Sequence, residues 1–210
     1  MRGVLVTVEG IDGCGKTTQV ALLESWLKDK GRAVRSVREP GGVPISERIR
    51  ELLLDPSGEG MSAITELLLY EASRAQLVND VIRPALDSGQ VVICDRYTDS
   101  TMAYQGYGRG LPKEFIAELN IRATNGVVPA KTVVLDIALS EAVRRRKESG
   151  PADRLEGEGN PFYERVRRGF LAVAQQEPER VVVVDGTPNA ETVADSVRLA
   201  VVQSILDDVD

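Results

Sequence analysis

The sequence predicts an α/β fold, a five-stranded parallel sheet flanked by helices. Short runs of mostly β-branched apolar residues occur at 4–8, 33–37, 91–94, 133–135 and 181–184, as in strands that are buried on both faces. Longer stretches of helical period separate these runs. Alternation of this kind is typical of a parallel sheet with helices on both sides.

In chain order, the first strand (4–8) ends at a glycine-rich loop that precedes a helix at 16–29. The second strand (33–37) leads to Pro40-Gly41-Gly42-Val43-Pro44, a loop because these residues cannot continue a strand. Further helices are expected at 44–54, 62–86, 112–125, 139–149, 161–176 and 190–206. Residues 149–161 hold three glycines and two prolines, which predicts a mobile surface loop.

Length and composition narrow the class of protein. A length of 210 residues without an internal linker predicts one domain, 1–210, with the segment at about 144–161 acting as a lid. The absence of histidine excludes Ser-His-Asp triads and a histidine general base. Two cysteines and no apolar run long enough for a membrane span lead us to expect a cytoplasmic protein. The net charge of −6 argues against a nucleic acid as the main partner.

The loop after the first strand carries the most informative motif for nucleotide binding. Residues 10–17 match G-x-x-x-x-G-K-[ST] between a predicted strand and a predicted helix, as the motif requires. Its backbone N–H groups converge on phosphate oxygens at a helix N-terminus. Lys16 would reach the β- and γ-phosphates of ATP, and the Thr17 hydroxyl would bind Mg²⁺. The expected ATP-binding residues are Gly10, Ile11, Asp12, Gly13, Cys14, Gly15, Lys16, Thr17 and Thr18.

Two residues of this loop are not explained by phosphate binding. A carboxylate repels phosphate, so Asp12 either only shapes the turn or faces another polar group, and the sequence leaves both open. Cys14 is expected to fill space and not to act as a nucleophile.

A second candidate metal ligand stands at the end of the third strand. Asp95 follows the run 91–94, where a carboxylate binds Mg²⁺ directly or through water. Asp136 follows the fourth strand in the same way and is the alternative. Asp95 is favoured because Arg96 comes next and places a cation at the sheet edge where ligands of α/β proteins bind.

Arginines are expected around a site that joins two phosphates. Two unit charges about 4 Å apart repel by about 4 kcal/mol at an effective dielectric constant of about 20. Guanidinium groups bind phosphate through paired donors and can offset this repulsion. The run at 144–147 could equally be a solvated helix end. The candidates are Arg38, Arg74, Arg96, Arg154 and the run Arg144-Arg145-Arg146-Lys147.

A base-binding surface is suggested by aromatic residues that accompany these polar groups. Tyr70 and Arg74 lie four residues apart in a predicted helix and share one face, where they could stack on and read a nucleobase. Ordinary packing explains the pair as well. Tyr104 and Gln105 offer a second aromatic ring and an amide shortly after Asp95.

Together these segments resemble the thymidylate kinase family over nearly the whole chain. Residues 9–19 are similar to its phosphate loop, 38–42 to its proline–glycine loop, 73–76 to its base-reading helix and 153–156 to its lid. The run from Asp95 to Gly106 is the most specific part. The resemblance implies a P-loop nucleoside-monophosphate kinase fold, transfer of the γ-phosphoryl group of Mg·ATP to dTMP, and a homodimer.

The resemblance also implies substrate-binding roles. Arg96 and Arg38 would hold the dTMP phosphate, and Asp12 would meet the 3′-hydroxyl or the phosphate-binding arginine. Tyr104 would close off the 2′ side of the sugar. On the base side, the implied residues are Arg74 at the thymine carbonyl, Tyr70 stacked on the ring, and Thr101 and Gln105 as weaker candidates.

The catalytic arginine is the point at which this chain departs from part of the family. Some members carry it in the phosphate loop directly after the position of Asp12, where this chain has Gly13. The lid is therefore expected to supply it, through Arg154 or, as alternatives, Arg145 or Arg146. The expected catalytic set is Lys16, Asp95, Arg96 and Arg154.

Two other functions stay open at this point. A kinase for another nucleotide or nucleoside would share the phosphate loop, and a pocket separates dTMP from dUMP by only about 1–3 kcal/mol for one methyl group. A non-catalytic nucleotide-binding switch would share it too, but would have no phosphoryl acceptor. A phosphate acceptor is already ionised at neutral pH, so the lack of histidine is consistent with a monophosphate kinase.

Overall fold

A computed structural model describes residues 3–58, 60–147 and 154–206. Its centre is a five-stranded sheet in which every neighbouring pair is parallel. The strand order β2-β3-β1-β4-β5 places β1 in the middle, so successive strands leave it in opposite directions and open a crevice at its carboxyl end. The strands are β1 (Val4–Glu9), β2 (Val34–Arg38), β3 (Val91–Asp95), β4 (Lys131–Asp136) and β5 (Val181–Asp185). The predicted fold class is confirmed.

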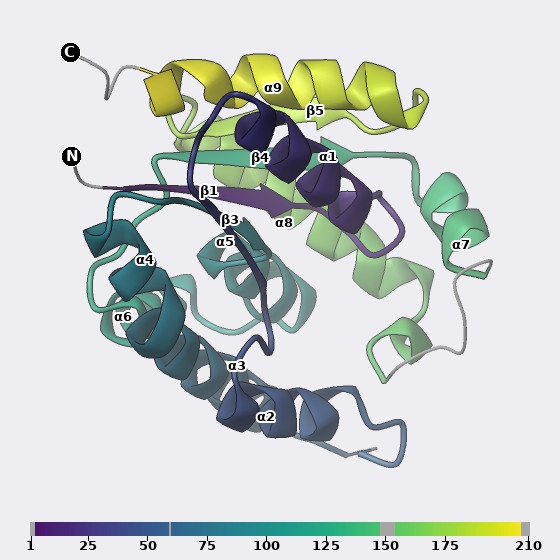
Figure 1. Cartoon of the computed structure of the whole chain (residues 1–210). Helices are drawn as coiled ribbons and strands as arrows, with labels where there is room; N and C mark the ends of the chain where they lie inside the picture. The colour runs from purple at the N-terminus through teal and green to yellow at the C-terminus, as the bar shows by residue number, and fades with distance from the viewer. Residues whose placement is uncertain (1–2, 59, 148–153, 207–210) are drawn as a thin grey trace.

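Helices cover both faces of this sheet (Figure 1). On one face, α1 and α9 pack against each other and against the strands. On the other, α8 packs on β4 and β5, and α4 packs on β3. An arm formed by α2 and α3 extends from the sheet edge (Figure 1). The main helices are α1 (Lys16–Asp29), α2 (Pro44–Leu54), α3 (Ala63–Leu77), α4 (Arg83–Asp87), α6 (Lys113–Thr124), α7 (Leu139–Lys147), α8 (Asn160–Gln176) and α9 (Ala190–Leu206).

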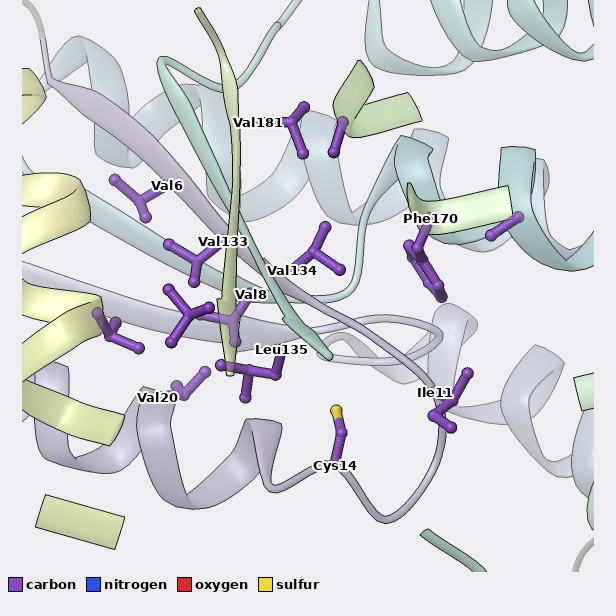
Figure 2. Packing of buried hydrophobic residues seen from close by; sticks show 14 of the residues in the cluster. Val6, Val8, Ile11, Cys14, Val20, Val133, Val134, Leu135, Phe170 and Val181 are labelled. Carbon is purple, nitrogen blue, oxygen red and sulfur yellow. The ribbon is translucent and has the colours of Figure 1, made fainter. Parts of the chain in front are cut away.

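The alternation of side chains along β4 explains why both faces need cover. Val133 and Leu135 lie on the side of α1, where Val20 packs, and Val134 lies on the opposite side toward Phe170 (Figure 2). All five of these apolar side chains are buried. The strand is therefore held from both sides, and its carboxyl end is fixed relative to the loops that follow it.

The predicted helix at 62–86 is present with an interruption. A π-helical turn, η1 (Val78–Ile82), joins α3 to α4. Pro84 sits in the first turn of α4 and has no N–H to donate to the residue four positions earlier. A wider turn ahead of the proline lets the chain continue as one helical rod.

Two elements after β3 were not predicted. The segment following Asp95 forms a short helix, α5 (Thr98–Thr101), and then a π-helix, η2 (Met102–Gly108). Such wide turns are frequent at functional sites. In the predicted loop, Glu156–Glu158 forms a 3₁₀ turn, η3, whereas residues 148–153, including Asp153 and the end of the helix expected at 139–149, lie outside the described residues. Within the described ranges, no helix has the length and apolar character needed to cross a membrane.

Candidate active site

The glycine-rich loop wraps the end of β1 and leads straight into α1. Gly13 has a φ of 85°, and a Cβ there would lie 2.5 Å from the Ala142 carbonyl oxygen and 3.0 Å from Cγ of Arg146. Only glycine fits, because both the backbone angle and the contact exclude a side chain. The basic helix α7 therefore packs directly against the phosphate loop. An arginine at position 13 would have no room in this arrangement.

Within the loop, Lys16 is held over the backbone. Its ammonium donates to the carbonyl oxygens of Gly10 at 3.2 Å and Ile11 at 3.1 Å, and the side chain is buried. Cys14 lies in the hydrophobic core, and burial raises the pKa of its thiol. This placement fits a space-filling residue and not a nucleophile.

The two candidate metal ligands are in contact. The Thr17 hydroxyl donates to Asp95 Oδ2 at 3.0 Å, which joins the start of α1 to the end of β3. The alternative carboxylate, Asp136, instead accepts two hydrogen bonds from Arg167 at 2.6 and 2.7 Å. Adjacent hydroxyl and carboxylate oxygens fit the preference of Mg²⁺ for hard ligands. No cluster of three or more metal-binding side chains occurs in the described ranges, so an ion here would need oxygens from nucleotide phosphates or water as well.

Asp12 faces a polar group, which answers one of the open questions. It pairs with Arg96 at 2.5 Å and accepts hydrogen bonds from the hydroxyls of Tyr104 at 2.7 Å and Tyr163 at 3.1 Å. Burial alone would raise the pKa of Asp12, but the positive charges of Arg96 and Lys16 outweigh it and hold the pKa well below its usual value. Asp12 is thus an ionised anchor for Arg96.

Arg96 itself adopts a backbone conformation that L-residues rarely occupy, with φ of 71°. Glu9, at the end of β1, stabilises the turn by accepting from the Tyr97 backbone N–H at 2.7 Å and the Ser100 hydroxyl at 2.6 Å. Burial and the charge of Asp99 raise the pKa of Glu9 to about 7. Sequence reasoning gave Glu9 no role, since a glutamate at a strand end carries no distinctive signal.

A pocket opens between this turn and the helical arm. Seven of its lining residues were predicted to bind substrate: Asp12, Tyr70, Arg74, Arg96, Thr101, Tyr104 and Gln105. Arg38 does not line it; its guanidinium bonds both Glu47 carboxylate oxygens, at 2.9 and 3.0 Å. Arg50 of α2, which sequence reasoning missed, takes a place in the wall and donates to the Pro40 carbonyl oxygen at 3.0 Å.

Arg74 is the most buried cation of the pocket wall, with 1% of its surface exposed. It pairs with the carboxylates of Glu39 at 2.8 Å and Glu71 at 2.9 Å. It also donates to Thr101 Oγ1, Asn120 Oδ1 and the Tyr97 carbonyl oxygen. Burial would lower the pKa of Arg74, but the two carboxylates outweigh this and raise it. Arg74 therefore joins α3, α5 and α6 as well as facing the pocket.

The arginines of the predicted lid occupy two different places. Arg154 pairs with buried Glu66 of α3 at 2.7 Å and donates to the Leu53 carbonyl oxygen of α2 at 2.9 Å. Arg146 lies against the phosphate loop, with its guanidinium carbon 4.1 Å from the centre of the Tyr163 ring. Arg145 pairs with Glu141 and donates to the Gly186 carbonyl oxygen.

Sequence reasoning also missed Tyr163, Glu39 and Glu66. Tyr163 reaches Asp12 from α8, 151 positions along the chain. The two glutamates are buried partners of arginines on other elements. A glutamate in a helix or loop is normally solvated, so the sequence offers no sign of such burial.

The fold and site together define a P-loop nucleoside-monophosphate kinase: a phosphate loop on a parallel sheet beside an arginine-lined pocket for a second anion. The family profile described as thymidylate kinase matches residues 8–197. The chain belongs to the thymidylate kinase family.

Individual relatives agree over almost the full length. A thymidylate kinase of Symbiobacterium thermophilum is 47% identical over 195 residues, covering 93% of this chain and 91% of that protein. One of Deinococcus radiodurans is 48% identical over 186 residues, covering 89% and 90%. The crystal structure of thymidylate kinase from Ehrlichia chaffeensis superposes with a TM-score of 0.77 at 33% identity, covering 94% of this chain and 97% of that one.

Proposed function

We propose that this chain transfers the γ-phosphoryl group of Mg·ATP to the 5′-phosphate of dTMP, giving dTDP and ADP, as its family membership implies. A phosphate oxygen of dTMP attacks the γ-phosphorus, and the bond to the β-phosphate breaks with its electron pair going to ADP. The observation that carries the proposal is the pocket beside the phosphate loop, with Arg96 fixed at its edge by Asp12. The acceptor is already ionised, so the protein needs to position and neutralise charge and not to remove a proton.

At the phosphate end, we assign the binding of ATP to the loop amides and Lys16. Arg96 and Arg50 would hold the dTMP phosphate, since both line the pocket. Arg50 takes the role expected of Arg38, because Arg38 is paired with Glu47 at the rim. Arginine suits this task because its fork of donors matches phosphate oxygens.

Mg²⁺ would be held by Thr17 and Asp95 together with the nucleotide phosphates. The contact between these two side chains at the end of β3 supports this assignment. A bound Mg²⁺ neutralises charge that develops on the transferred phosphoryl group.

At the base end, Tyr70, Arg74, Thr101 and Gln105 would receive the thymine ring, because all four line the pocket. Tyr104 would close off the sugar. Its hydroxyl is fixed by Asp12, and its ring packs edge-on against Phe162 and Phe170. A rigid ring at this position leaves little space for a ribose 2′-hydroxyl.

For the catalytic arginine of the lid, we favour Arg146 over Arg154. Arg146 lies beside Gly13 of the phosphate loop, whereas Arg154 is engaged by Glu66 and the end of α2. Arg154 would then hold the lid segment to the helical arm.

The decisive test is ADP release with Mg·ATP and a panel of dTMP, dUMP, UMP, dCMP, GMP and thymidine. We expect dTMP to give the strongest stimulation, with dUMP well behind. Stimulation by thymidine alone would identify a nucleoside kinase. Failure of every acceptor to stimulate ADP release would leave only a nucleotide-binding switch.

We also propose a homodimer and a cytoplasmic location. The outer faces of α3 and α6 expose Ile64, Leu68, Phe115 and Ile121, an apolar surface that suits a second copy. The two cysteines are free and buried, as in reducing compartments. Sedimentation of the wild type and of Leu68→Lys tests the dimer: the variant should sediment as a monomer, and an unchanged oligomer would exclude this surface.

A further inference from the structure

Glu66 is a buried carboxylate of α3 that the proposed chemistry does not use. It is 0% exposed and receives hydrogen bonds from Gln105, Arg109 and Arg154. Burial would raise its pKa, but the hydrogen bonds from Arg109 and Gln105 outweigh it, and the pKa lies below the usual value. The group is therefore an ionised acceptor with no proton to donate.

This contact settles which way the Gln105 amide points. An amide has a donating Nε2 and an accepting Oε1, and only Nε2 can bond to a carboxylate. The Gln105 Nε2 donates to Glu66 Oε1 at 2.8 Å. Because the two amide atoms point in different directions from their shared carbon, Oε1 points away from Glu66, and it belongs to a residue that lines the pocket.

A carbonyl oxygen in that position distinguishes pyrimidines by the edge they present. Thymine and uracil carry an N–H at ring position 3, which a carbonyl oxygen accepts. Cytosine carries a lone pair at the same position, which a carbonyl oxygen repels. An amide free to rotate would present either atom and would accommodate both kinds of base.

Resting on the proposed function, we infer that Glu66 is a specificity-determining positioning residue, which fixes the Gln105 amide so that the pocket accepts bases with N3–H and rejects cytosine. Arg109 holds both carboxylate oxygens of Glu66 in place, and Arg154 adds a further contact to one of them. Arg109 bonds it through Nε at 3.1 Å and through its terminal nitrogen at 2.8 Å. Glu66 acts on the base through Gln105, without touching it.

The experiment compares kcat/KM for dTMP, dUMP and dCMP in the wild type and in Glu66→Gln. In the variant, residue 66 can present either a donor or an acceptor to Gln105, so its amide can turn. We expect the dTMP-to-dCMP ratio to fall roughly tenfold, because the hydrogen-bond match at N3 is lost. The dTMP-to-dUMP ratio should stay unchanged, since both bases carry N3–H. A purely structural defect would not separate the two ratios.

Four further variants keep the inference falsifiable. Arg154→Ala removes a partner of Glu66 but leaves the bond to Gln105, so its dTMP-to-dCMP ratio should stay at the wild-type value. In Gln105→Met the dTMP-to-dCMP ratio should fall at least as far as in Glu66→Gln. The double variant that carries both substitutions should show no further fall. If Glu66→Gln does not fold, Glu66→Asp keeps the charge for the arginines but draws back from Gln105, and the same loss is expected.

The outcomes are distinguishable. An active enzyme whose Glu66→Gln and Glu66→Asp variants keep the wild-type dTMP-to-dCMP ratio would overturn this inference and leave the proposed function intact. If the dTMP-to-dCMP ratio fell as far in Arg154→Ala as in Glu66→Gln, the inference would be overturned as well, because the effect would then come from the lid segment. A wild-type protein that does not phosphorylate dTMP would overturn the proposed function and the inference together.

Discussion

The two ends of the pocket are built in different ways. The phosphate end is made mainly from two short segments, the loop at 10–17 and the turn at 95–97, which meet at adjacent strand ends, with Arg50 added from α2. The base end is made from buried ion pairs between segments far apart in the sequence, such as Arg74 of α3 with Glu39 after β2, and Arg154 with Glu66 of α3. A loop of backbone amides can bind phosphate beside many different side chains. In a buried ion pair, by contrast, removing one partner leaves the other charge buried and uncompensated. The phosphate end should therefore show its mutational effects in kcat, and the base end in specificity and stability.

The largest expected effect is at the phosphate end. Lys16→Ala should lower kcat by about 10³-fold or more, since it removes a charge aimed at the transferred phosphoryl group. The thermal midpoint should change little, because among the described residues Lys16 donates to two carbonyl oxygens and a thiol of its own loop. Coupled ADP release and circular dichroism measure the two quantities. Normal turnover in a folded variant would contradict the assignment of Lys16 to the binding of the ATP phosphates.

At the base end, Arg74→Ala should affect stability and dTMP binding together. It leaves the carboxylates of Glu39 and Glu71 buried without their cation, which costs about 3–5 kcal/mol of unfolding free energy. Urea unfolding measures that loss. Steady-state kinetics should show KM rising much more for dTMP than for ATP. Equal increases for both substrates would contradict a base-side role.

The two lid arginines sharpen the comparison because Arg146 lies beside the phosphate loop and Arg154 lies against the helical arm. Arg146→Ala should lower kcat by about 10²-fold if it stabilises the transferred charge beside Gly13. Arg154→Ala should lower stability and raise KM, with a smaller change in kcat, because its partners belong to the helical arm. Single-turnover kinetics of both variants separate these effects. A loss of kcat confined to Arg154→Ala would return the catalytic role to that residue.

The smallest effect expected is a pH dependence from the base end. Burial raises the pKa of Glu39 to about 7; Arg74 opposes this and the charge of Glu71 adds to it. Between its ordinary value of 4.5 and about 7, the folded protein holds a proton that the unfolded chain has released. The free energy of unfolding should therefore fall as pH rises through this window and level off above it.

Glu71→Gln provides the matched variant for this pH dependence. Removing the charge of Glu71 lowers the pKa of Glu39, so the fall in stability should move to lower pH. A change of one pKa unit corresponds to about 1.4 kcal/mol, which urea titrations between about pH 5 and pH 8 can resolve. Identical pH profiles for the wild type and Glu71→Gln would exclude a contribution from this pair.

The elements of the fold were largely readable because their signals are local. The helices expected at 16–29 and 44–54 are present with those bounds, as Lys16–Asp29 and Pro44–Leu54. The stretch 98–108 was missed because π-helical turns have no apolar period of their own. Asp12 shows the same limit in the site: its sequence left two roles open, and contacts with Arg96, Tyr104 and Tyr163 decided between them.

The sequence by itself determined the parallel sheet, the phosphate loop and the aspartate that follows the third strand, since each depends on the order and period of neighbouring residues. Only the tertiary structure decided which charged side chains serve the pocket. Arg50 lines its wall and Arg38 does not, Arg154 is paired with Glu66, and Glu39 is a buried partner of Arg74. The physical reason is that charged side chains take their roles from the partners that burial gives them, and those partners lie far away in the sequence.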